Sequence, residues 1–193
     1  MINIVLFGPP GSGKGTQAKN LVQKFNLKQI STGELFRENM SNETELGLLA
    51  KSFIDVGQLV PDHITIDMLT DELQKPTDTQ GFIFDGFPRT KQQAIALDDI
   101  VRQHLDAEIS VCLSLIVEDE VLVERLIERG ATSGRTDDSD ELIIRNRIKE
   151  YYAKTAEVAD IYKEQNKYVE VNGVGEIDAI AENLYRAVES IEG

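Results

Sequence analysis

The feature that most constrains the fold is a glycine-rich run, residues 8–16 (GPPGSGKGT), between an apolar segment and a helical one. Residues 2–7 (INIVLF) are typical of a buried β-strand, and residues 14–25 have the apolar spacing of a helix. A strand, a tight turn and a helix in this order begin a βαβ unit. The run therefore predicts an α/β fold built on a parallel sheet.

The rest of the chain continues this alternation of short apolar runs and amphipathic stretches. Further strands are expected at residues 28–31, 82–84, 109–117 and 168–171. Helices are expected at residues 33–40, 45–55, 62–74, 90–104, 119–129, 139–165 and 176–191. Two helix starts carry capping boxes, Ser31 with Glu34 and Asp138 with Glu141. The prediction is one α/β domain in three layers, with a five-stranded parallel sheet flanked by helices.

The glycine-rich run has the chemistry of a phosphate-binding loop. Glycines let successive backbone N–H groups face inward as an anion nest, and the helix start adds partial positive charge. Lys14 can then reach the phosphates as a point charge. Gly15 stands where the strict pattern has Ser or Thr, so Thr16 is the hydroxyl best placed to approach Mg²⁺. The loop indicates nucleotide binding but does not specify a reaction.

A second informative run is residues 82–89 (FIFDGFPR). An apolar strand that ends in Asp85 places a carboxylate at the carboxyl edge of the sheet, beside the expected phosphate loop. A carboxylate there can hold the water shell of Mg²⁺. Gly86 and Pro88 shape a turn that presents Arg89 to the same place. The run predicts an acidic and a cationic group at one site.

Charge and cysteine content exclude several classes. A net charge of −14 argues against nonspecific binding to nucleic acid or to an anionic membrane. The apolar runs are too short to span a bilayer, and the first residues lack the basic flank of a signal peptide. Cys112 allows no intrachain disulfide, and His63 and His104 have no metal-ligand spacing. We expect a cytoplasmic protein without a zinc site, and a monomer because no coiled-coil pattern or extended apolar face is evident.

Arginines are distributed unevenly in this acidic chain. Six of the nine lie near predicted turns or helix ends: Arg37, Arg89, Arg125, Arg129, Arg135 and Arg147. Guanidinium groups suit forked recognition of phosphate oxygens, although any one of them could equally be a solvated ion pair. Their proximity to the two runs above favours a phosphate site.

The runs GPPGSGKGTQA, STGELFR, DVGQLVPD, GFIFDGFPRTKQQA and SGRTDD, in this order, resemble the adenylate kinase family over essentially the whole chain. The resemblance implies a P-loop kinase fold in which residues 31–60 form a mobile monophosphate-binding insert and residues 128–138 a short mobile lid. It also implies phosphoryl transfer from Mg·ATP to AMP, with ATP, AMP and ADP as ligands. No zinc is expected, because the lid is the short form without cysteines.

The resemblance further implies the binding residues. On the ATP side it places Gly11, Ser12, Gly13, Lys14, Gly15, Thr16, Arg125, Arg129, Gly175 and Ile177. On the AMP side it places Thr32, Arg37, Gln58, Leu59, Val60, Gly86, Phe87, Pro88, Arg89, Gln93, Arg135 and Arg147. The catalytic set is Lys14, Arg89, Arg129, Arg135 and Arg147, with Mg²⁺ near Thr16 and Asp85 through water. The segment DDSDELIIRNR is one residue longer than the usual spacing, so Arg145 competes with Arg147; alignment on the Tyr151–Tyr152 pair favours Arg147.

Alternatives stay open on sequence alone. A UMP/CMP kinase would share the reaction class, and only Thr32 and the run TKQQA, by resemblance, favour AMP as the acceptor. A nucleotide-binding module without kinase activity would keep the phosphate loop but would not need Arg37 and Arg89 as a second phosphate site. A purely structural acidic domain would leave the clustered glycines and arginines unexplained. The sequence does not choose between ATP and GTP as the donor.

Overall fold

The computed structural model describes residues 1–138 and 140–191. Within these residues the strands form a five-stranded sheet in the order β2-β3-β1-β4-β5, and every neighbouring pair is parallel. The strands are β1 (Ile2–Phe7), β2 (Lys28–Ser31), β3 (Gly81–Asp85), β4 (Val111–Ile116) and β5 (Tyr168–Asn172). The predicted fold class is confirmed, and each predicted strand is present with its ends shifted by two residues or fewer.

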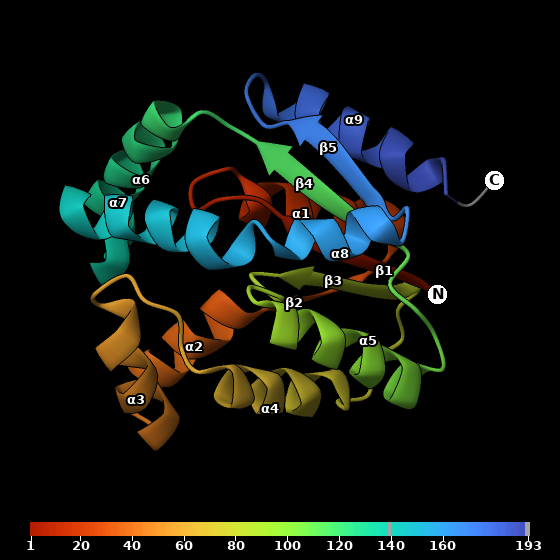
Figure 1. Ribbon diagram of the computed structural model, residues 1–193, viewed down its shortest axis with the longest axis horizontal. Helices are drawn as coiled ribbons and strands as arrows, with labels where there is room; N and C mark the ends of the chain where they lie inside the picture. The colour runs from red at the N-terminus through yellow and green to blue at the C-terminus, as the bar shows by residue number, and fades with distance from the viewer. Residues whose placement is uncertain (139, 192–193) are drawn as a thin grey trace.

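Helices cover both faces of the sheet (Figure 1). They are α1 (Lys14–Phe25), α2 (Thr32–Ser41), α3 (Glu45–Ile54), α4 (Asp62–Leu73), α5 (Lys91–Leu105), α6 (Asp119–Ser133), α7 (Glu141–Glu150), α8 (Val158–Glu164) and α9 (Ile177–Glu189). A 3₁₀ turn spans Thr136–Asp138, and a π-helical turn spans Tyr151–Thr155. In the described part of the chain no helix combines the length and the apolarity needed to cross a membrane.

The central strand β1 explains the three layers. Successive side chains of a strand point to opposite faces. Val5 and Phe7 accordingly join the core covered by α4, α5 and α8, whereas Ile4 and Leu6 join the core covered by α1 and α9. All four side chains are almost completely buried. β1 lies between β3 and β4, so strands β2 and β3 are added on one side of it and β4 and β5 on the other. The loop after β1 therefore lies where the strand order reverses, which is where ligands bind in open α/β sheets.

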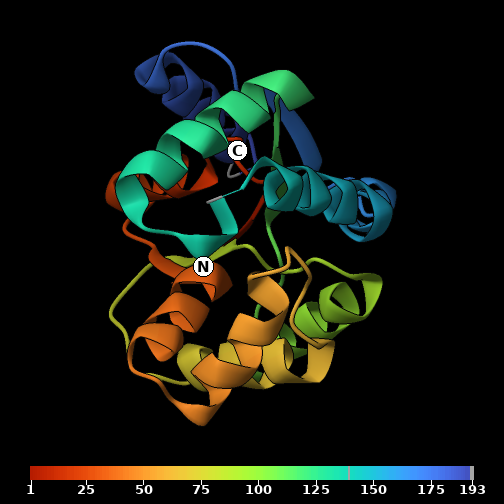
Figure 2. The same cartoon turned by 90° about the vertical axis from the view of Figure 1, so that its left-hand side faces the viewer.

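Two smaller cores lie beyond the sheet. Phe36, Ala50 and Val60 form one between α2, α3 and the segment that leads into α4. Leu122, Leu126 and Ile144 belong to another, which joins α6 to α7. Figure 2 shows α6 and the 3₁₀ turn on one side and α2 and α3 on the other. The Thr136 hydroxyl bridges the two sides by donating to Asp55 Oδ1 at 2.7 Å.

The single helix predicted over residues 139–165 is wrong. Residue 139 lies outside the described residues, and the rest divides into α7, the π-helical turn and α8. In the π turn the Ala156 N–H donates to the Tyr151 carbonyl at 2.9 Å, an i→i+5 bond that inserts one residue into the helical register. Every residue there tolerates helix, so apolar periodicity gave no sign of the insertion.

The predicted cap at Asp138 is also wrong, whereas the cap at Ser31 is confirmed. Ser31 Oγ accepts from the Glu34 N–H at 3.4 Å and begins α2. At the other site Asp140 is the cap, because its Oδ1 accepts from the Leu142 N–H at 2.6 Å. Asp138 ends the 3₁₀ turn, and its carboxylate is bound to arginines instead. A short acidic run offers several candidate caps, and the sequence alone does not show that Asp138 is buried and paired with arginines.

Candidate functional site

A cleft of about 450 Å³ opens at the carboxyl ends of β1, β2 and β3. Most of the predicted site residues line it: Gly11, Gly13, Lys14, Gly15, Thr16, Thr32, Arg37, Gln58, Leu59, Val60, Asp85, Gly86, Phe87, Pro88, Arg89, Gln93, Arg125, Arg129, Arg135 and Arg147. Three predicted residues do not: Ser12, Gly175 and Ile177. Ser12 is a buried residue of the phosphate loop itself, and Ile177 is 54% exposed and lies outside the cleft.

The phosphate loop has the geometry of an anion nest. Gly13 immediately precedes α1 with a φ of +96°, and no side chain caps the helix there. A residue with a Cβ would be strained in this left-handed conformation, so glycine permits the tight entry into the helix. The first residues of α1 line the cleft, and no side chain caps this helix start, as an anion site there requires.

Lys14 lies across this loop. Its Nζ donates to the Gly8 carbonyl at 2.6 Å and to the Pro9 carbonyl at 2.8 Å. Burial lowers the pKa of Lys14 to about 7, Asp85 opposes this shift, and the charge of Arg89 adds to it. An anion that entered the cleft would favour the charged ammonium over the neutral amine. The loop therefore positions a cation that an incoming phosphate stabilises.

Asp85 and Thr16 supply hard oxygen donors on the same wall. Asp85 is the last residue of β3 and is 8% exposed. Its Oδ2 accepts from Gln29 Nε2 at 3.1 Å. Thr16 lies on the first turn of α1 and lines the cleft. Among the described residues, no group of three or more His, Cys, Asp or Glu side chains could hold a metal ion. One carboxylate and one hydroxyl fit Mg²⁺, which commonly keeps its waters and binds mainly through substrate phosphates.

A polar cluster forms the opposite end of the cleft. The Gly86 carbonyl accepts from Thr32 Oγ1 at 2.9 Å and from Arg89 Nε at 2.7 Å. The Phe87–Pro88 peptide bond that follows is cis. Gln93 is buried at the start of α5, and its Oε1 accepts from the Arg89 N–H at 2.7 Å. These contacts tie the loop after β3 to the starts of α2 and α5.

Arg37 and Arg135 are two of the six arginines that line the cleft. Within residues 1–138 and 140–191, neither the Arg37 nor the Arg135 guanidinium forms an ion pair with a carboxylate. Burial, together with the charge of Arg135, lowers the pKa of Arg37 to about 10. Like charges held close in a partly buried site are stabilised by an anionic ligand.

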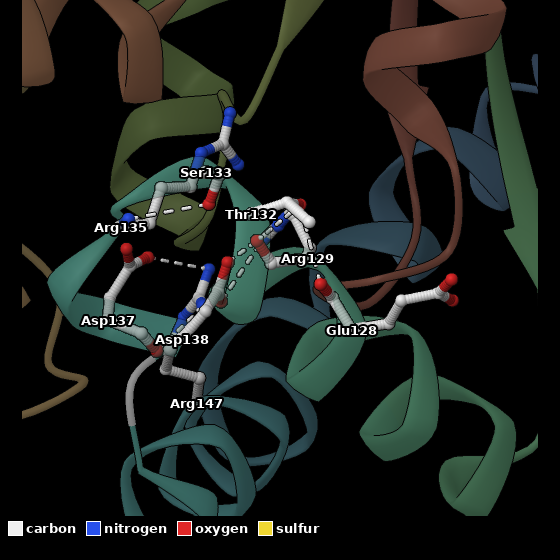
Figure 3. A network of polar contacts seen from close by, with 8 residues as sticks. All are labelled: Glu128, Arg129, Thr132, Ser133, Arg135, Asp137, Asp138 and Arg147. Carbon is white, nitrogen blue, oxygen red and sulfur yellow. Dashed lines mark hydrogen bonds and ion pairs between the residues drawn. The ribbon is translucent and has the colours of Figure 1, made fainter.

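Arg129 and Arg147, two further arginines of the cleft, are held by aspartates of the 3₁₀ turn (Figure 3). Asp138 lies between them: Arg129 Nε donates to its Oδ2 at 2.6 Å, and Arg147 Nη1 donates to its Oδ1. Arg147 Nη2 also pairs with Asp137 Oδ2 at 3.0 Å. The Glu128 side chain points away from this network. The aspartates thus hold two cations at the cleft wall in a fixed orientation.

Gly130 explains how the 3₁₀ turn approaches α6. It lies inside α6, which runs to Ser133, four residues beyond the predicted helix end at residue 129. A Cβ on Gly130 would lie 2.1 Å from the Asp138 carbonyl oxygen. Only glycine leaves room for the turn to pack against the helix and to place Asp138 against Arg129. Glycine is needed at this position for close packing and not for a left-handed backbone conformation.

The spacing of Arg145 and Arg147 separates their environments. Two residues along a helix point in different directions. Arg145 is exposed and pairs with Glu141 at 2.8 Å and with Glu120 at 3.4 Å. Arg147 faces the cleft, with a side chain that is 17% exposed. The geometry places only Arg147 of this pair at the cleft.

Sequence reasoning missed several residues of this site. Asp138 was taken for a helix cap and Asp137 was given no role of its own, although the alternation of acidic residues with Arg129, Arg135 and Arg147 was a usable signal. Thr155 lines the cleft and donates from Oγ1 to the Arg89 carbonyl at 3.0 Å. Nothing in the sequence distinguishes it from an ordinary helical threonine.

Asp138→Asn is expected to lower the free energy of unfolding near neutral pH by about 1–3 kcal/mol, because two guanidinium groups lose their shared counter-charge. Burial raises the pKa of Asp138, but hydrogen bonds and charges from Arg129 and Arg147 outweigh burial and lower it below the ordinary 3.8. A carboxyl group with a lowered pKa in the folded state stabilises the fold above 3.8 and loses this effect as the pH falls through the folded value.

Urea unfolding of both proteins, near neutral pH and in steps toward acid, checks this prediction. The difference between them should be largest near neutral pH and shrink in acid. The control is Asp160→Asn, because its exposed carboxylate pairs with Lys163 at 3.6 Å and its loss should change stability little. A pH-independent difference for Asp138→Asn would contradict the charge argument.

Sequence comparisons with known proteins point to one family. The sequence model of the family described as "Adenylate kinase" matches residues 6–167. A protein named "Adenylate kinase" from Flavobacterium psychrophilum is 53% identical over 191 residues, which cover 99% of this chain and 100% of the relative. One from Parabacteroides distasonis is 45% identical over 192 residues, 100% of each chain, and one from Azobacteroides pseudotrichonymphae is 40% identical over 191 residues, 99% of each. The chain therefore belongs to the adenylate kinase family.

Proposed function

We propose that the chain binds Mg·ATP and AMP end to end in the cleft and transfers the γ-phosphoryl group reversibly between them, giving two ADP. The observation that carries this proposal is a cleft with two distinct ends, in a protein whose net charge is −14. The phosphate loop and Lys14 lie at one end, and Thr32, Arg37 and Gln93 line the other. Arginines occupy the space between these ends.

The phosphate loop is the donor side in this proposal. Gly11, Gly13 and Gly15 bring backbone N–H groups to the ATP phosphates, and Lys14 contacts the β- and γ-phosphates. Arg125 and Arg129 border the same side, and Arg125 donates from Nη1 to the Gly173 carbonyl at 3.1 Å. That contact supports extending the adenine site along the cleft edge toward Gly175 and Ile177.

The acceptor side is the cluster around Gly86. Arg37 and Arg89 bind the AMP phosphate, and both reach the cleft with free N–H donors. Thr32, Gln58, Leu59 and Val60 border the adenine, with Gln93 as the polar reader of its edge. A buried polar reader discriminates strongly, because a wrong base leaves it unpaired.

The chemistry needs positioning and charge rather than a protein nucleophile. An oxygen of the AMP phosphate attacks the γ-phosphorus in line, and the bond to the β-phosphate oxygen of ATP breaks. Lys14, Arg89, Arg129, Arg135 and Arg147 stabilise the charge that spreads over the equatorial oxygens. Bound Mg²⁺ would neutralise phosphate charge at the site made by Thr16 and Asp85.

Water competes with AMP as the acceptor of the γ-phosphoryl group. Hydrolysis is avoided if the catalytic groups come together only after both nucleotides have bound. We propose that residues 31–60 and 128–138 close over the ligands. The separate core of Phe36, Ala50 and Val60 supports movement of the first segment as a unit. Arg135 belongs to the second segment, residues 128–138, and lines the cleft. The next residue, Thr136, donates to Asp55 of the first segment, so closure of the two segments would place Arg135 in the completed site.

Location and assembly are proposals of the same kind. A buried Cys112, whose thiol pKa is raised by burial, suits a reducing compartment such as the cytoplasm. A complete cleft within one chain supports a monomer.

The direct test is to mix the protein with ADP and Mg²⁺ and to follow the nucleotides by phosphorus NMR. ATP and AMP should appear in equal amounts, and excess EDTA should stop their formation. With ATP as donor, AMP should be a far better acceptor than CMP, UMP or GMP. Equal rates for these acceptors, or loss of ADP without formation of AMP, would contradict the proposal.

A further inference from the structure

The amide of Gln93 is held from two sides. Its Oε1 accepts from the Arg89 backbone N–H at 2.7 Å, and its Nε2 donates to Asp62 Oδ1 at 2.8 Å. Gln93 is 2% exposed and lines the acceptor end of the cleft, beside Val60 and Gly86. Few alternative positions are open to a side chain that is so buried and doubly bonded.

The two partners also determine which way the amide points. A backbone N–H can only donate, and an ionised carboxylate can only accept. Turning the amide over would place Nε2 against the Arg89 N–H and Oε1 against the Asp62 carboxylate, so both hydrogen bonds would be replaced by repulsion. The orientation therefore follows from the chemistry of the neighbours and not only from the atom positions.

Asp62 itself is fixed by the elements that meet at this end of the cleft. It is the first residue of α4, two positions after Val60. Its Oδ2 accepts from Thr90 Oγ1 at 2.9 Å, and the same hydroxyl caps α5 by accepting from the Gln93 N–H at 3.2 Å. One carboxylate thus joins the start of α4 to the start of α5 and contacts the Gln93 amide.

We propose that Asp62 is a positioning residue for base selection, which acts by fixing the Gln93 amide; this rests on the proposed function. The Gln93 amide has two N–H donors on its nitrogen and two lone pairs on its oxygen. Asp62 takes one of the donors and the Arg89 N–H takes one of the lone pairs, so one donor and one acceptor stay free. The lock presents these to the acceptor base in one order only. Adenine offers a donor beside an acceptor on its pairing edge, and hypoxanthine offers the reverse. A locked amide reads one of them, whereas a freed amide can turn and read both.

The experiment compares AMP and IMP as phosphoryl acceptors at saturating ATP, because these two nucleotides differ only in this edge. Wild type, Asp62→Ala and the control Asp67→Ala are measured; Asp67 is an exposed acidic residue of the same helix. Asp62→Ala is expected to lower the ratio of kcat/KM for AMP to that for IMP by ~10-fold, through a higher KM for AMP, with the KM for ATP unchanged. Asp67→Ala should keep the wild-type ratio.

Further variants separate positioning from a general structural effect. Asp62→Asn keeps an acceptor oxygen in place and should retain more selectivity than Asp62→Ala. In a Gln93→Ala background, Asp62→Ala should lower the ratio no further, because the two residues act as one unit. If Asp62→Ala fails to fold, Asp62→Ser keeps a polar helix start with a shorter side chain and should lose selectivity in the same way.

Three results would overturn the proposal. The first is an unchanged ratio of kcat/KM for AMP to that for IMP in folded Asp62→Ala or Asp62→Ser. The second is an equal loss of this ratio in Asp62→Asn and Asp62→Ala. The third is a full further loss of the ratio when Asp62→Ala is added to Gln93→Ala. Failure of the proposed function would look different, since wild type would then not phosphorylate AMP at all.

Discussion

Lys14→Met is expected to lower kcat for AMP phosphorylation by ~10²–10³-fold, the usual loss on removing one preorganised donor from a transition state, while the chain stays folded. Lys14 Nζ lies against the Gly8 and Pro9 carbonyls, where the phosphates of ATP are proposed to bind. Methionine has a similar length and can fill the space, but it carries no charge and no N–H donor. Steady-state kinetics with thermal melting of the same sample measures both effects.

The matched control is Lys24→Met on the same helix. Lys24 is exposed, pairs with Glu189 at 3.6 Å and lies far along α1 from the loop. This variant should keep near-wild-type turnover, because exposed pairs contribute little. Near-normal kcat in folded Lys14→Met would refute the role given to the phosphate loop, since the loop would then bind no reacting phosphate.

Arg89→Lys is expected to cause a loss of similar size, ~10²–10³-fold in kcat, although the charge is retained. Arg89 Nε donates to the Gly86 carbonyl at 2.7 Å, which leaves the two Nη groups directed as a fork. Burial lowers the pKa of Arg89, and the charge of Arg147 lowers it further, as expected for a cation placed to receive an anion. Lysine offers a point charge that cannot hold Gly86 and phosphate oxygens together.

Arg102→Lys is the control for Arg89→Lys. Arg102 is exposed, pairs with Asp99 at 3.3 Å and does not line the cleft, so its replacement should change neither kcat nor the KM for AMP. Wild-type kinetics in Arg89→Lys would mean that charge alone suffices at this position. The forked contact would then have no part in the reaction.

Features set by local pattern could be predicted from the sequence. The strand, glycine loop and helix of residues 2–25 are contiguous, so backbone preference and apolar periodicity specify them without tertiary information. Asp85 and Arg89 were placed correctly at the cleft because strand ends of a parallel sheet meet at one edge. The resemblance added the second end of the cleft, which no single run would have indicated.

What could not be predicted depends on contacts between distant segments. The π turn at Tyr151–Thr155 is a change of hydrogen-bond register in a stretch that is helical by every local measure. Asp138 has its role only because the fold brings Arg129 and Arg147 against its carboxylate. The close packing of the 3₁₀ turn on α6 likewise depends on the absence of a side chain at Gly130. Asp62 has the sequence of an ordinary helix start, and its contacts with Thr90 and Gln93 appear only when α4 packs on α5.

Counting the nucleotide sites by calorimetry tests the central claim most directly, since that claim requires two phosphate-bearing ligands bound end to end in one chain. Titration with a non-hydrolysable ATP analogue and then with AMP should give one equivalent of each per chain. A dinucleotide with two adenosines joined through a phosphate bridge should bind once, more tightly than either, and exclude both. A single shared site, from which the ATP analogue displaces AMP, would contradict the account.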